Sequence, residues 1–423
     1  MQERRINNLI IGAGISGLTL AYYLKKDYLI LEKENEAGGY CRTIKNPDYV
    51  WDYAGHFYHF KTDKFKELFL SMVEPEEIVT KTKITKIYYK DKLIDFPFQM
   101  NIHQLEKEEF IECLYDLYFK KGKDNYDNFL DMLYGKFGKA IVEKFLQPYN
   151  EKLYAVDLRK LDTDAMGRFF PYADVEAIIR NMKKQKNNSY NDTFLYLKKG
   201  TQFFIDRLLS HLDKDNISFN TEVNSIDVDE KFVLTNKGEK IFYQNLINTT
   251  PLNVFLKNLN TERTDKIVSS MSYNKVLVLN IGFNSPSARY QDEHWVYFPD
   301  KGLNFYRVGF YNNILGTDKL SVYVEIGYSK DQDINVEREL TDTLSNMKKV
   351  GIIDENNMMI DYSSVVMDPA YVHISHETDA MIKDEINELN EKNVFTLGRY
   401  GKWTYSSMED CMVWAEELSD LIA

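Results

Sequence analysis

The chain has 423 residues, and 44% of them are hydrophobic, which excludes a disordered or collagen-like chain and indicates a large core divided among two or three domains. Its formal net charge of −12 argues against a general nucleic-acid or anionic-membrane binder, because such proteins normally carry a basic surface. The three widely spaced cysteines (Cys41, Cys113 and Cys411) exclude a disulfide framework or a CxxC metal site and favour a reducing cytoplasm.

The N-terminal segment superficially resembles a signal peptide, since Arg4 and Arg5 precede an apolar stretch at 9–24. Glycines interrupt this stretch, no small-residue cleavage site follows it, and a second apolar run at 28–31 ends in an acid. No other stretch approaches the length needed to span a bilayer. We therefore expect a cytoplasmic protein without a transmembrane segment.

The same N-terminal segment predicts a dinucleotide site. A short buried strand at 6–11, a helix at 18–24 and a second strand at 28–31 surround a G-x-G-x-x-G motif, and Glu32 follows the second strand. The motif glycines are Gly12, Gly14 and Gly17. They permit a tight turn, close approach of a pyrophosphate and close helix–strand packing, while the helix N-terminus attracts the phosphates. Glu32 is expected to accept hydrogen bonds from a ribose.

The residues after Glu32 indicate which dinucleotide is bound. Gly38, Gly39, Arg42 and Thr43 form a G-G-x-x-R-T segment. This segment resembles the continuation found in the superfamily of FAD-containing amine oxidases, protoporphyrinogen oxidases and UDP-galactopyranose mutases. The glycines would let backbone amides approach the pyrophosphate, and Arg42 would add a forked cationic donor. The resemblance implies FAD rather than NAD as the tightly bound cofactor.

Further along the chain, the hydrophobic periodicity predicts a helical lobe, a helix and a set of strands. The helical lobe covers 102–184, with helices at 105–119, 126–134 and 138–146. A mobile surface loop is expected at 183–192, a helix at 203–212 and a hairpin turn at 236–238. An antiparallel sheet that covers the flavin is expected from strands at 275–283, 295–298, 305–310 and 321–327.

Two segments narrow the resemblance to UDP-galactopyranose mutases. Residues 51–59 resemble the histidine segment beside the mutase flavin, where Gly55 would bring the backbone to the ring and His56 would lie near N5. The alternative is a strand with two histidines on opposite faces, and for His59 that alternative is favoured. Residues 93–101 resemble the stretch that leads into the mutase helical lobe.

Residues 147–156 resemble the mutase P-Y-N-x-K-x-W-A segment. The resemblance implies that Tyr149 stacks on uracil and that Tyr154 lines the sugar pocket, where the mutases have Trp. Arg168 matches the R-x-x-P pattern of the eukaryotic-type mutases, whose Arg grips the nucleotide-sugar, and Ala173 stands where the short bacterial type has a second Arg.

Residues 295–307 resemble the eukaryotic-type W-x-Y-F-P and F-Y-R segments, in which Tyr297 and Arg307 would hold the diphosphate. Because Arg307 lies in an apolar strand, an unpaired guanidinium there would be costly. We expect a bound anion to be its partner in preference to a structural salt bridge.

The C-terminal part gives a further match. Residues 245–251 resemble the strand by which the chain leaves the FAD domain, and residues 393–401 with a helix from about 408 to 421 resemble the segment that closes over the flavin. In the mutase pattern, Arg399 would face FAD and Tyr405 the substrate phosphate, and Tyr371 is a further candidate phosphate contact. The mutase Asn-Gln pair is replaced by residues 407–410, Ser-Met-Glu-Asp.

These matches predict an α/β (α+β multidomain) fold with a Rossmann-like FAD domain. The expected division assigns 1–90, 191–265 and 385–423 to the FAD domain, 91–190 to the helical lobe and 266–384 to an antiparallel substrate sheet. The predicted cofactor-binding residues are Gly12, Gly14, Ser16, Gly17, Glu32, Lys33, Gly39, Arg42, Gly55, His56, Arg399 and Met408. The predicted catalytic residues are His56, Arg168 and Arg307, and the predicted substrate-binding residues are Tyr149, Tyr154, Arg168, Tyr297, Arg307, Tyr371 and Tyr405.

The resemblance implies a UDP-sugar mutase for cell-surface polysaccharide biosynthesis, in which N5 of reduced FAD attacks the anomeric carbon. NAD(P)H is the expected reductant, no metal is expected, and a homo-oligomer is compatible with the sequence. Two alternatives stay open. One is a net-redox enzyme of the amine oxidase or protoporphyrinogen oxidase type, and the other is a catalytically silent FAD-binding protein.

Overall fold

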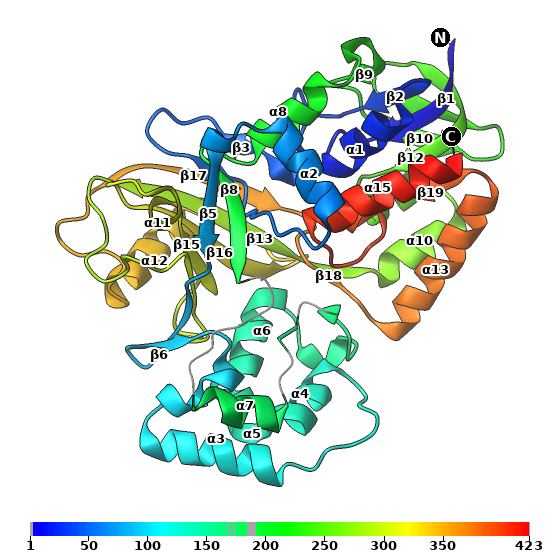
Figure 1. The fold of residues 1–423 in the computed structure, drawn as a ribbon. Helices are drawn as coiled ribbons and strands as arrows, with labels where there is room; N and C mark the ends of the chain where they lie inside the picture. The colour runs from blue at the N-terminus through cyan, green and yellow to red at the C-terminus, as the bar shows by residue number, and fades with distance from the viewer. Residues whose placement is uncertain (1–2, 168–169, 172–173, 184–191, 423) are drawn as a thin grey trace.

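The computed structural model describes residues 3–167, 170–171, 174–183 and 192–422. It places two sheets side by side with a helical lobe below them (Figure 1). The loop expected at 183–192 lies almost entirely outside the described residues. Among the described residues, we find no helix whose length and hydropathy would let it cross a bilayer.

The first sheet is the expected Rossmann-like sheet. Its strand order is β10-β11-β12-β1-β2-β9, and β19 pairs with β12. The strands are β1 (Glu3–Ile11), β2 (Tyr28–Leu31), β9 (Ile217–Ser218), β10 (Val223–Asp227), β11 (Phe232–Thr235), β12 (Lys240–Asn248) and β19 (Val394–Thr396). The parallel pairs β12–β1, β1–β2 and β12–β19 form its centre, and the expected hairpin joins β11 to β12. Central strands of this kind read as continuous apolar runs because both of their faces are buried.

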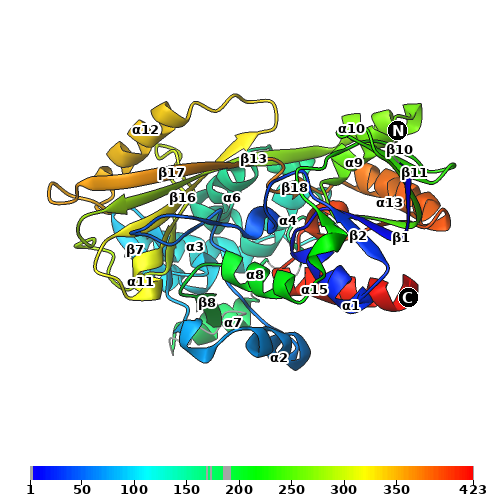
Figure 2. The same cartoon turned by 90° about the horizontal axis from the view of Figure 1, so that it is seen from above.

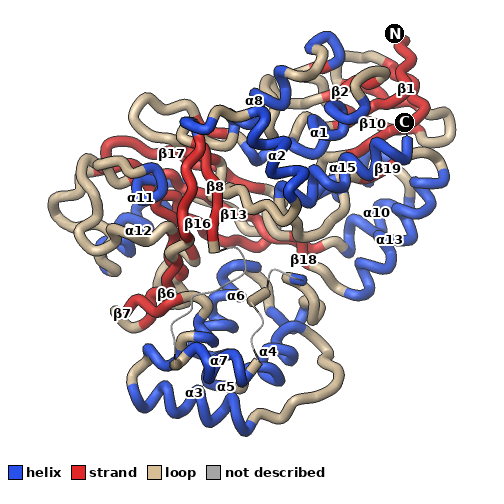
Figure 3. Tube along the Cα trace, in the orientation of Figure 1, coloured by secondary structure: helices blue, strands red, loops and turns tan. Residues whose placement is uncertain are grey.

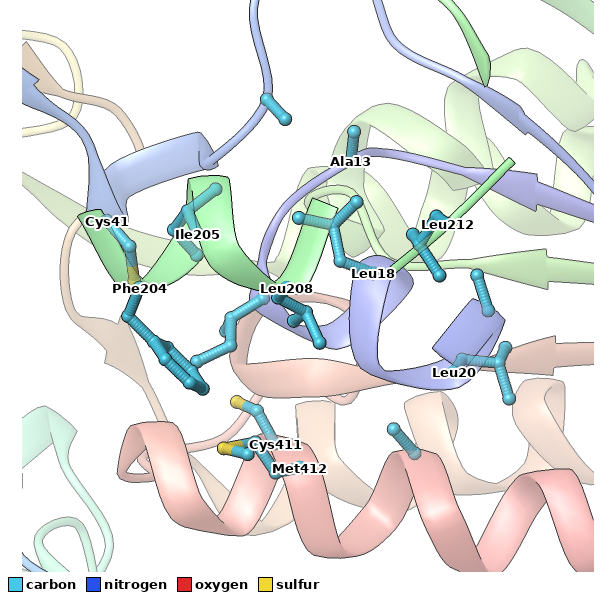
Figure 4. Packing of buried hydrophobic residues seen from close by; sticks show 14 of the residues in the cluster. Ala13, Leu18, Leu20, Cys41, Phe204, Ile205, Leu208, Leu212, Cys411 and Met412 are labelled. Atoms are coloured by element: carbon cyan, nitrogen blue, oxygen red, sulfur yellow. The ribbon is translucent and has the colours of Figure 1, made fainter. Parts of the chain in front are cut away.

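Three distant parts of the chain therefore meet in this sheet. Ile11 lies opposite Asn248, and Leu246 lies opposite Val394. Helices α1 (Ile15–Leu24), α8 (Gln202–Ser210) and α15 (Met408–Ile422) enclose one core against it. Leu18, Phe204, Leu208, Cys411 and Met412 meet in this core (Figure 4), so that the N-terminal and C-terminal helices pack directly on each other.

The second sheet is antiparallel over most of its width. Its order is β17-β13-β16-β15-β14-β6-β7, and β18 pairs with β13. The strands are β6 (Thr85–Tyr89), β7 (Lys92–Asp95), β13 (Ser272–Phe283), β14 (Trp295–Tyr297), β15 (Arg307–Phe310), β16 (Ser321–Ser329), β17 (Met359–Met367) and β18 (Val372–His373). Helix α12 (Val336–Lys349) packs on one face through Leu340 and Met347 (Figure 2). The opposite face turns toward the first sheet.

The helical lobe contains the expected helices with shifted ends (Figure 3). Its helices are α3 (Lys107–Phe119), α4 (Phe129–Phe137), α5 (Lys139–Ile141), a π-helical turn (Val142–Leu146), α6 (Gln147–Tyr154) and α7 (Val175–Asn181). Asn128 caps α4 by accepting a hydrogen bond from the amide of Asp131 at 2.9 Å, and this cap fixes the start of α4 after the predicted position.

The remaining elements connect these parts. The helices are α2 (Asp63–Met72), α9 (Leu252–Leu259), α10 (Glu262–Ser270), α11 (Tyr311–Leu315), α13 (His376–Glu391) and α14 (Gly398–Gly401). Two small antiparallel pairs join β3 (Thr43–Ile44) to β4 (Trp51–Asp52) and β5 (Ile78–Thr82) to β8 (Thr193–Leu197).

The predicted fold class is confirmed by this architecture, while the domain limits stay a prediction. Two strands lie outside the parts to which these limits assign them. β6 pairs in parallel with β14 and β7 pairs with β6, so both belong to the second sheet. Residues 85–89 were expected in the FAD domain and residues 92–95 in the helical lobe.

Candidate functional site

A cavity of about 800 Å³ lies between the two sheets. The glycine-rich turn after β1 lines one part of it, and residues of β15, β16 and β17 and of the segment around α14 line another. The predicted site residues that line it are Gly12, Gly14, Ser16, Glu32, Lys33, Gly39, Arg42, Gly55, His56, Arg307, Tyr371, Arg399, Tyr405 and Met408.

The three motif glycines have different surroundings, and each suits a different requirement of dinucleotide binding. Gly12 has a φ of +103°, and a Cβ there would lie 2.5 Å from Oγ1 of Thr249. A Cβ on Gly17 would collide with the carbonyl oxygen of Gly12. A Cβ on Gly14 would meet no atom within 4 Å, so its backbone borders open space in the cavity. The turn, the tight packing and the open approach that dinucleotide binding requires are therefore all present.

Glu32 is held in one orientation at the end of β2. Its Oε2 accepts a hydrogen bond from the amide of Ala13 at 2.7 Å, and its Oε1 accepts one from the amide of Glu34 at 3.0 Å. Each carboxylate oxygen has a second lone pair, so both can also accept a hydroxyl hydrogen bond. This geometry fits a ribose.

Arg42 carries a polar group that the protein leaves unsatisfied. Its Nη2 donates to the carbonyl oxygen of Glu36 at 2.9 Å, but its buried Nε has no hydrogen-bond partner in the part of the chain that the structure describes. A buried unpaired donor is costly, and a cationic one is more so. A pyrophosphate oxygen beside Gly14 and Gly39 would satisfy this donor, so these residues fit the expected dinucleotide.

His56 lies at the other part of the cavity as a neutral imidazole. Burial and the nearby charges of Arg399 and Arg307 lower its pKa to about 4. Within the described residues, its buried Nδ1 has no hydrogen-bond partner of good geometry, and only the Ala54 backbone acts on the ring in the direction of protonation. Next to it, a Cβ on Gly55 would collide with the Tyr323 ring, so this glycine is required by the packing of the protein itself.

His59 points to a different contact. Its Nδ1 lies 3.3 Å from the carbonyl oxygen of Thr193 on β8, and burial lowers its pKa to about 4. Because its ring nitrogen contacts the backbone of β8, His59 takes a structural position, although it also borders the cavity.

Arg307 was expected to be partnered by a bound anion in preference to a structural salt bridge, but the structure shows the salt bridge. Its Nε lies 2.9 Å from Oε2 of Glu325, and its Nη2 lies 2.5 Å from Oε1 of the same carboxylate. Arg307 and Glu325 are cross-strand neighbours on β15 and β16, and the Glu325 side chain is only 2% exposed. The desolvation that the apolar strand imposes is thus offset by a buried bidentate pair. This pair uses Nε and Nη2, and the same guanidinium also interacts with the hydroxyl of Tyr297.

Among the described residues that line the cavity, Arg399 is a cation without an acidic partner. Its guanidinium carbon lies 4.3 Å from the ring centroid of Tyr405 and 5.2 Å from that of Tyr371, and these two rings are stacked at 5.8 Å. Its nitrogens donate only long hydrogen bonds, of 3.4 and 3.5 Å, to the carbonyl oxygens of Ser406 and Ala370. Within the described part of the chain, no carboxylate forms an ion pair with it. This guanidinium therefore gives the cavity a positive charge that an anion can neutralise.

Three predicted substrate-binding tyrosines lie behind the cavity wall. Tyr149 stacks on Phe145 with centroids 5.2 Å apart and meets the edge of Tyr297 at 5.1 Å. The hydroxyl of Tyr297 accepts a hydrogen bond from Nε1 of Trp295 at 3.1 Å. Tyr154 is buried in the core of the helical lobe. None of the three lines the cavity, and their substrate contacts stay a prediction; Arg168 and Ala173 lie outside the described residues.

Some residues of this site were not predicted from the sequence. Glu325 pairs with Arg307, Tyr323 fills the space against Gly55, and Thr249 donates to the carbonyl oxygen of Ile11 at 2.8 Å beneath the glycine turn. The sequence does contain a pattern that could have identified Glu325: an acid inside the apolar segment Val322–Ile326 needs a buried partner. As for metals, no group of three or more His, Cys, Asp or Glu side chains within the described ranges could hold an ion.

Comparisons with known proteins agree with this geometry. Residues 10–72 match the family described as NAD(P)-binding Rossmann-like domain. Coproporphyrinogen III oxidase from Staphylococcus aureus is 27% identical over 289 residues, which cover 58% of this chain and 61% of that enzyme. The matched part therefore spans less than two thirds of that relative.

The structural similarity extends over nearly the whole chain. A structure of reduced UDP-galactopyranose mutase superposes with a TM-score of 0.92 at 22% identity, covering 99% of this chain and 93% of the other. A putative protoporphyrinogen oxidase from Exiguobacterium sp. 255-15 superposes with a TM-score of 0.76 at 18% identity, covering 99% and 98%. The chain thus has the fold of UDP-galactopyranose mutase, and its predicted resemblance is confirmed at the level of the fold. This fold, which includes a Rossmann-like dinucleotide-binding domain, is shared with oxidases.

Proposed function

We propose that this protein is an FAD-dependent enzyme with an anionic substrate, and that it interconverts the ring forms of a UDP-sugar. The single observation that carries the proposal is the Arg399 guanidinium, which lines the cavity beside two tyrosines and has no acidic partner among the described residues. The sequence resemblance assigns Arg399 to FAD, whereas we assign it to the substrate. A diphosphate would neutralise this charge, and the hydroxyls of Tyr371 and Tyr405 are suited to donate to phosphate oxygens.

The glycine-rich part of the cavity would hold FAD. Glu32 would accept the ribose hydroxyls, the backbone at Gly14 and Gly39 would approach the pyrophosphate, and the unpaired Nε of Arg42 would donate to it. His56 and Met408, which also line the cavity, would border the ring. When bound and reduced, the flavin supplies a nucleophilic nitrogen toward a sugar carbon.

The residues of the chain would position the substrate and stabilise its leaving group. Arg399 and the Nη1 edge of Arg307 would hold the departing diphosphate, where fixed cations act more strongly than in water. Glu325 fixes the Arg307 guanidinium in one plane and thereby orients that edge. Neutral His56 would add no positive charge to the site. Its Nδ1 would donate or accept one hydrogen bond, depending on which ring nitrogen carries the proton. NAD(P)H as reductant and a role in polysaccharide biosynthesis belong to the same proposal.

A second candidate function is oxidation of a porphyrinogen. The sequence relative from Staphylococcus aureus, a coproporphyrinogen III oxidase, favours it. A porphyrinogen with carboxylate side chains would also find a cation in Arg399, so the charge of the site does not by itself separate the two reactions. The two differ in electron balance: a mutase consumes no net reductant, whereas an oxidase passes electrons to an acceptor.

The test compares these balances on the same preparation of the purified protein. After confirming bound flavin by its absorbance, we would reduce it and follow UDP-galactopyranose by chromatography, with coproporphyrinogen and oxygen uptake in parallel. Conversion that requires reduction but consumes no stoichiometric reductant supports the mutase. Oxygen uptake with coproporphyrinogen and no sugar conversion would replace it with the second candidate.

Binding of UDP to the Arg399→Met variant checks the site itself. We expect UDP affinity to fall by about tenfold or more while FAD stays bound, because a charge-assisted contact contributes roughly 1.5–3 kcal/mol. Lys402→Met is the matched control, since it removes an exposed cation three residues away. Equal UDP affinity in both variants would remove Arg399 from the proposal. Arg307→Ala is a poorer test, because it would also leave Glu325 buried and unpaired.

A further inference from the structure

Strand β17 is an edge strand of the second sheet. Among the described strands it pairs only with β13, and it ends the strand order on that side (Figure 2). Its nine residues, Met359–Met367, contain no Lys, Arg or Pro and only one charge, that of Asp361. Exposed edges are normally blunted by such residues, because their free N–H and C=O groups would otherwise pair with another strand.

The backbone groups that face outward can be assigned. The amide of Tyr362 donates to Oδ1 of its neighbour Asp361 at 2.8 Å, so it points away from β13. Backbone groups alternate in direction along an antiparallel strand, so the N–H and C=O groups of Tyr362, Ser364 and Val366 all point to the outer edge, where the N–H of Tyr362 is bonded to Asp361 and would exchange that bond on pairing. Their side chains share one face, and those of Tyr362 and Val366 are 39% and 42% exposed.

We propose that β17 pairs with β17 of a second copy of this chain, antiparallel about a two-fold axis beside Ser364. In this register, Ser364 lies opposite Ser364 of the second copy, and Tyr362 lies opposite its Val366. The second sheet then continues from one subunit into the other through a ladder of backbone hydrogen bonds.

The side chains of β17 suit this self-pairing. An aromatic residue opposite a β-branched one is among the favourable cross-strand pairs, and the two-fold axis forms it twice. The acids are kept apart, because Asp361 lies opposite Met367 and Asp368 lies opposite Ile360. In a two-fold dimer the β17 edge of each copy is paired with β17 of the other copy, so no third chain can pair with either edge. These features favour a second copy over an unrelated extended peptide.

A cysteine placed on the axis tests the register. In a hydrogen-bonded antiparallel pair, facing Cα atoms lie about 5.5 Å apart, which is within the range for a disulfide. Full-length Ser364→Cys should therefore form a covalent dimer under mild oxidation, seen on a non-reducing gel. The three native cysteines are buried and should not compete.

Ile360→Cys is the control on the same strand, at an exposed position where the register with β13 shifts by one residue. In the proposed register, its two copies are separated by eight residue steps, which is roughly 27 Å, so it should stay monomeric on the gel. Equal cross-linking of both variants would show random collision and overturn the proposed register. No cross-linking of Ser364→Cys would overturn the pairing.

Light scattering on the full chain gives an independent readout. The unmodified protein should have twice the mass of one chain at micromolar concentration. Ser364→Lys should raise the dimer dissociation constant by at least about tenfold, because it places two ammonium groups face to face. Thr80→Lys, an exposed substitution on strand β5, should have no effect. A single-chain mass for the unmodified protein, or heterogeneous aggregates in place of a dimer, would contradict the proposal.

Discussion

Arg42 shows how one side chain can be incomplete without a ligand. Only its Nη2 has a close hydrogen bond, to Glu36, and its nearest carboxylate oxygen, on Glu34, is 3.9 Å away. We predict that Arg42→Met lowers FAD affinity by about tenfold, because it removes a charge-assisted donor to the pyrophosphate. The flavin-to-protein absorbance ratio after gel filtration measures this.

The control for that experiment is Arg5→Met, which removes an exposed arginine stacked on Phe242. Its flavin content should equal that of the unmodified protein. Full flavin occupancy in Arg42→Met would show that the buried Nε does not serve the cofactor.

The Arg307–Glu325 pair predicts a loss of stability that is separate from substrate binding. Arg307→Met should lower the free energy of unfolding by about 3–5 kcal/mol, because it leaves a carboxylate that is 2% exposed without its partner. Arg307→Met combined with Glu325→Leu should regain most of that loss, since the unpaired charge is gone. Urea unfolding of both variants tests this, and a double variant as unstable as the single one would contradict it.

These residues also show what the sequence could and could not predict about the site. Gly12, Gly14 and Glu32 belong to one short local motif, so their spacing was sufficient to predict the turn and the strand end that carry them, while their contacts with FAD stay a prediction. Arg307 and Glu325 are 18 residues apart and become neighbours only through the register of β15 with β16. The register of two strands depends on packing across the whole sheet, so the sequence of either strand alone does not determine it.

At the scale of elements, Lys152 connects helix α6 to the second sheet through hydrogen bonds to backbone carbonyls. Its Nζ donates to the carbonyl oxygens of Phe298 and Asp300 at 2.8 Å each and of Phe305 at 2.5 Å. These carbonyls belong to the stretch between β14 and β15, which carry Tyr297 and Arg307. Lys152 thus joins the helical lobe to the strands that border the candidate site.

We predict that Lys152→Met lowers the free energy of unfolding by about 3 kcal/mol, because three carbonyl acceptors lose their shared donor, an amine whose pKa burial lowers to about 7. Lys301→Met is the control, since its 64% exposed side chain forms a surface pair with Glu151 and should change stability by less than about 1 kcal/mol. Thermal unfolding distinguishes the two variants. Similar losses of unfolding free energy in both would show that the Lys152 hydrogen bonds do not stabilise the contact between α6 and the second sheet.

At the level of elements, strong periodicity was the dependable signal. The helix predicted at 105–119 and the strand predicted at 275–283 correspond to α3 and β13 with small changes at their ends. Strand β17 escaped prediction because it lies at an edge, where most of its side chains are exposed and no inward periodicity is imposed on them.

For the whole molecule, the closure of the Rossmann-like sheet by distant segments was predicted from motifs at 245–251 and 393–401, and the structure confirms it through the pairs of β12 with β1 and β19. The packing between the sheets was not predictable in the same way. Residues such as Tyr323 reach from β16 toward Gly55, and only the assembled sheets bring them together.

The assembled interior also makes the fold sensitive to acid. Burial lowers the pKa of His294 and of His373 to about 4. His373 lies 2.9 Å through Nε2 from the carbonyl oxygen of Tyr154 and 2.7 Å through Nδ1 from Oγ of Ser272, so it joins the helical lobe to β13 as a neutral ring. Between about pH 6.5 and pH 4, the unfolded chain binds protons that the folded chain excludes. The stability that these histidines contribute is therefore present above about pH 6.5 and is lost as the pH falls toward 4.

We predict that His373→Gln flattens this pH dependence. The variant should be less stable than the unmodified protein at about pH 7.5, since its hydrogen bonds are altered, but the difference should shrink by roughly 2–3 kcal/mol by about pH 4.5. Urea unfolding across this pH range measures both curves. His211→Gln changes an exposed ring and should leave a curve parallel to that of the unmodified protein. The prediction fails if the stability curve of His373→Gln is also parallel to that of the unmodified protein. In that case, the His373 imidazole of the unmodified protein would be protonated in the folded state at low pH, and its contacts with Tyr154 and Ser272 would tolerate the charge.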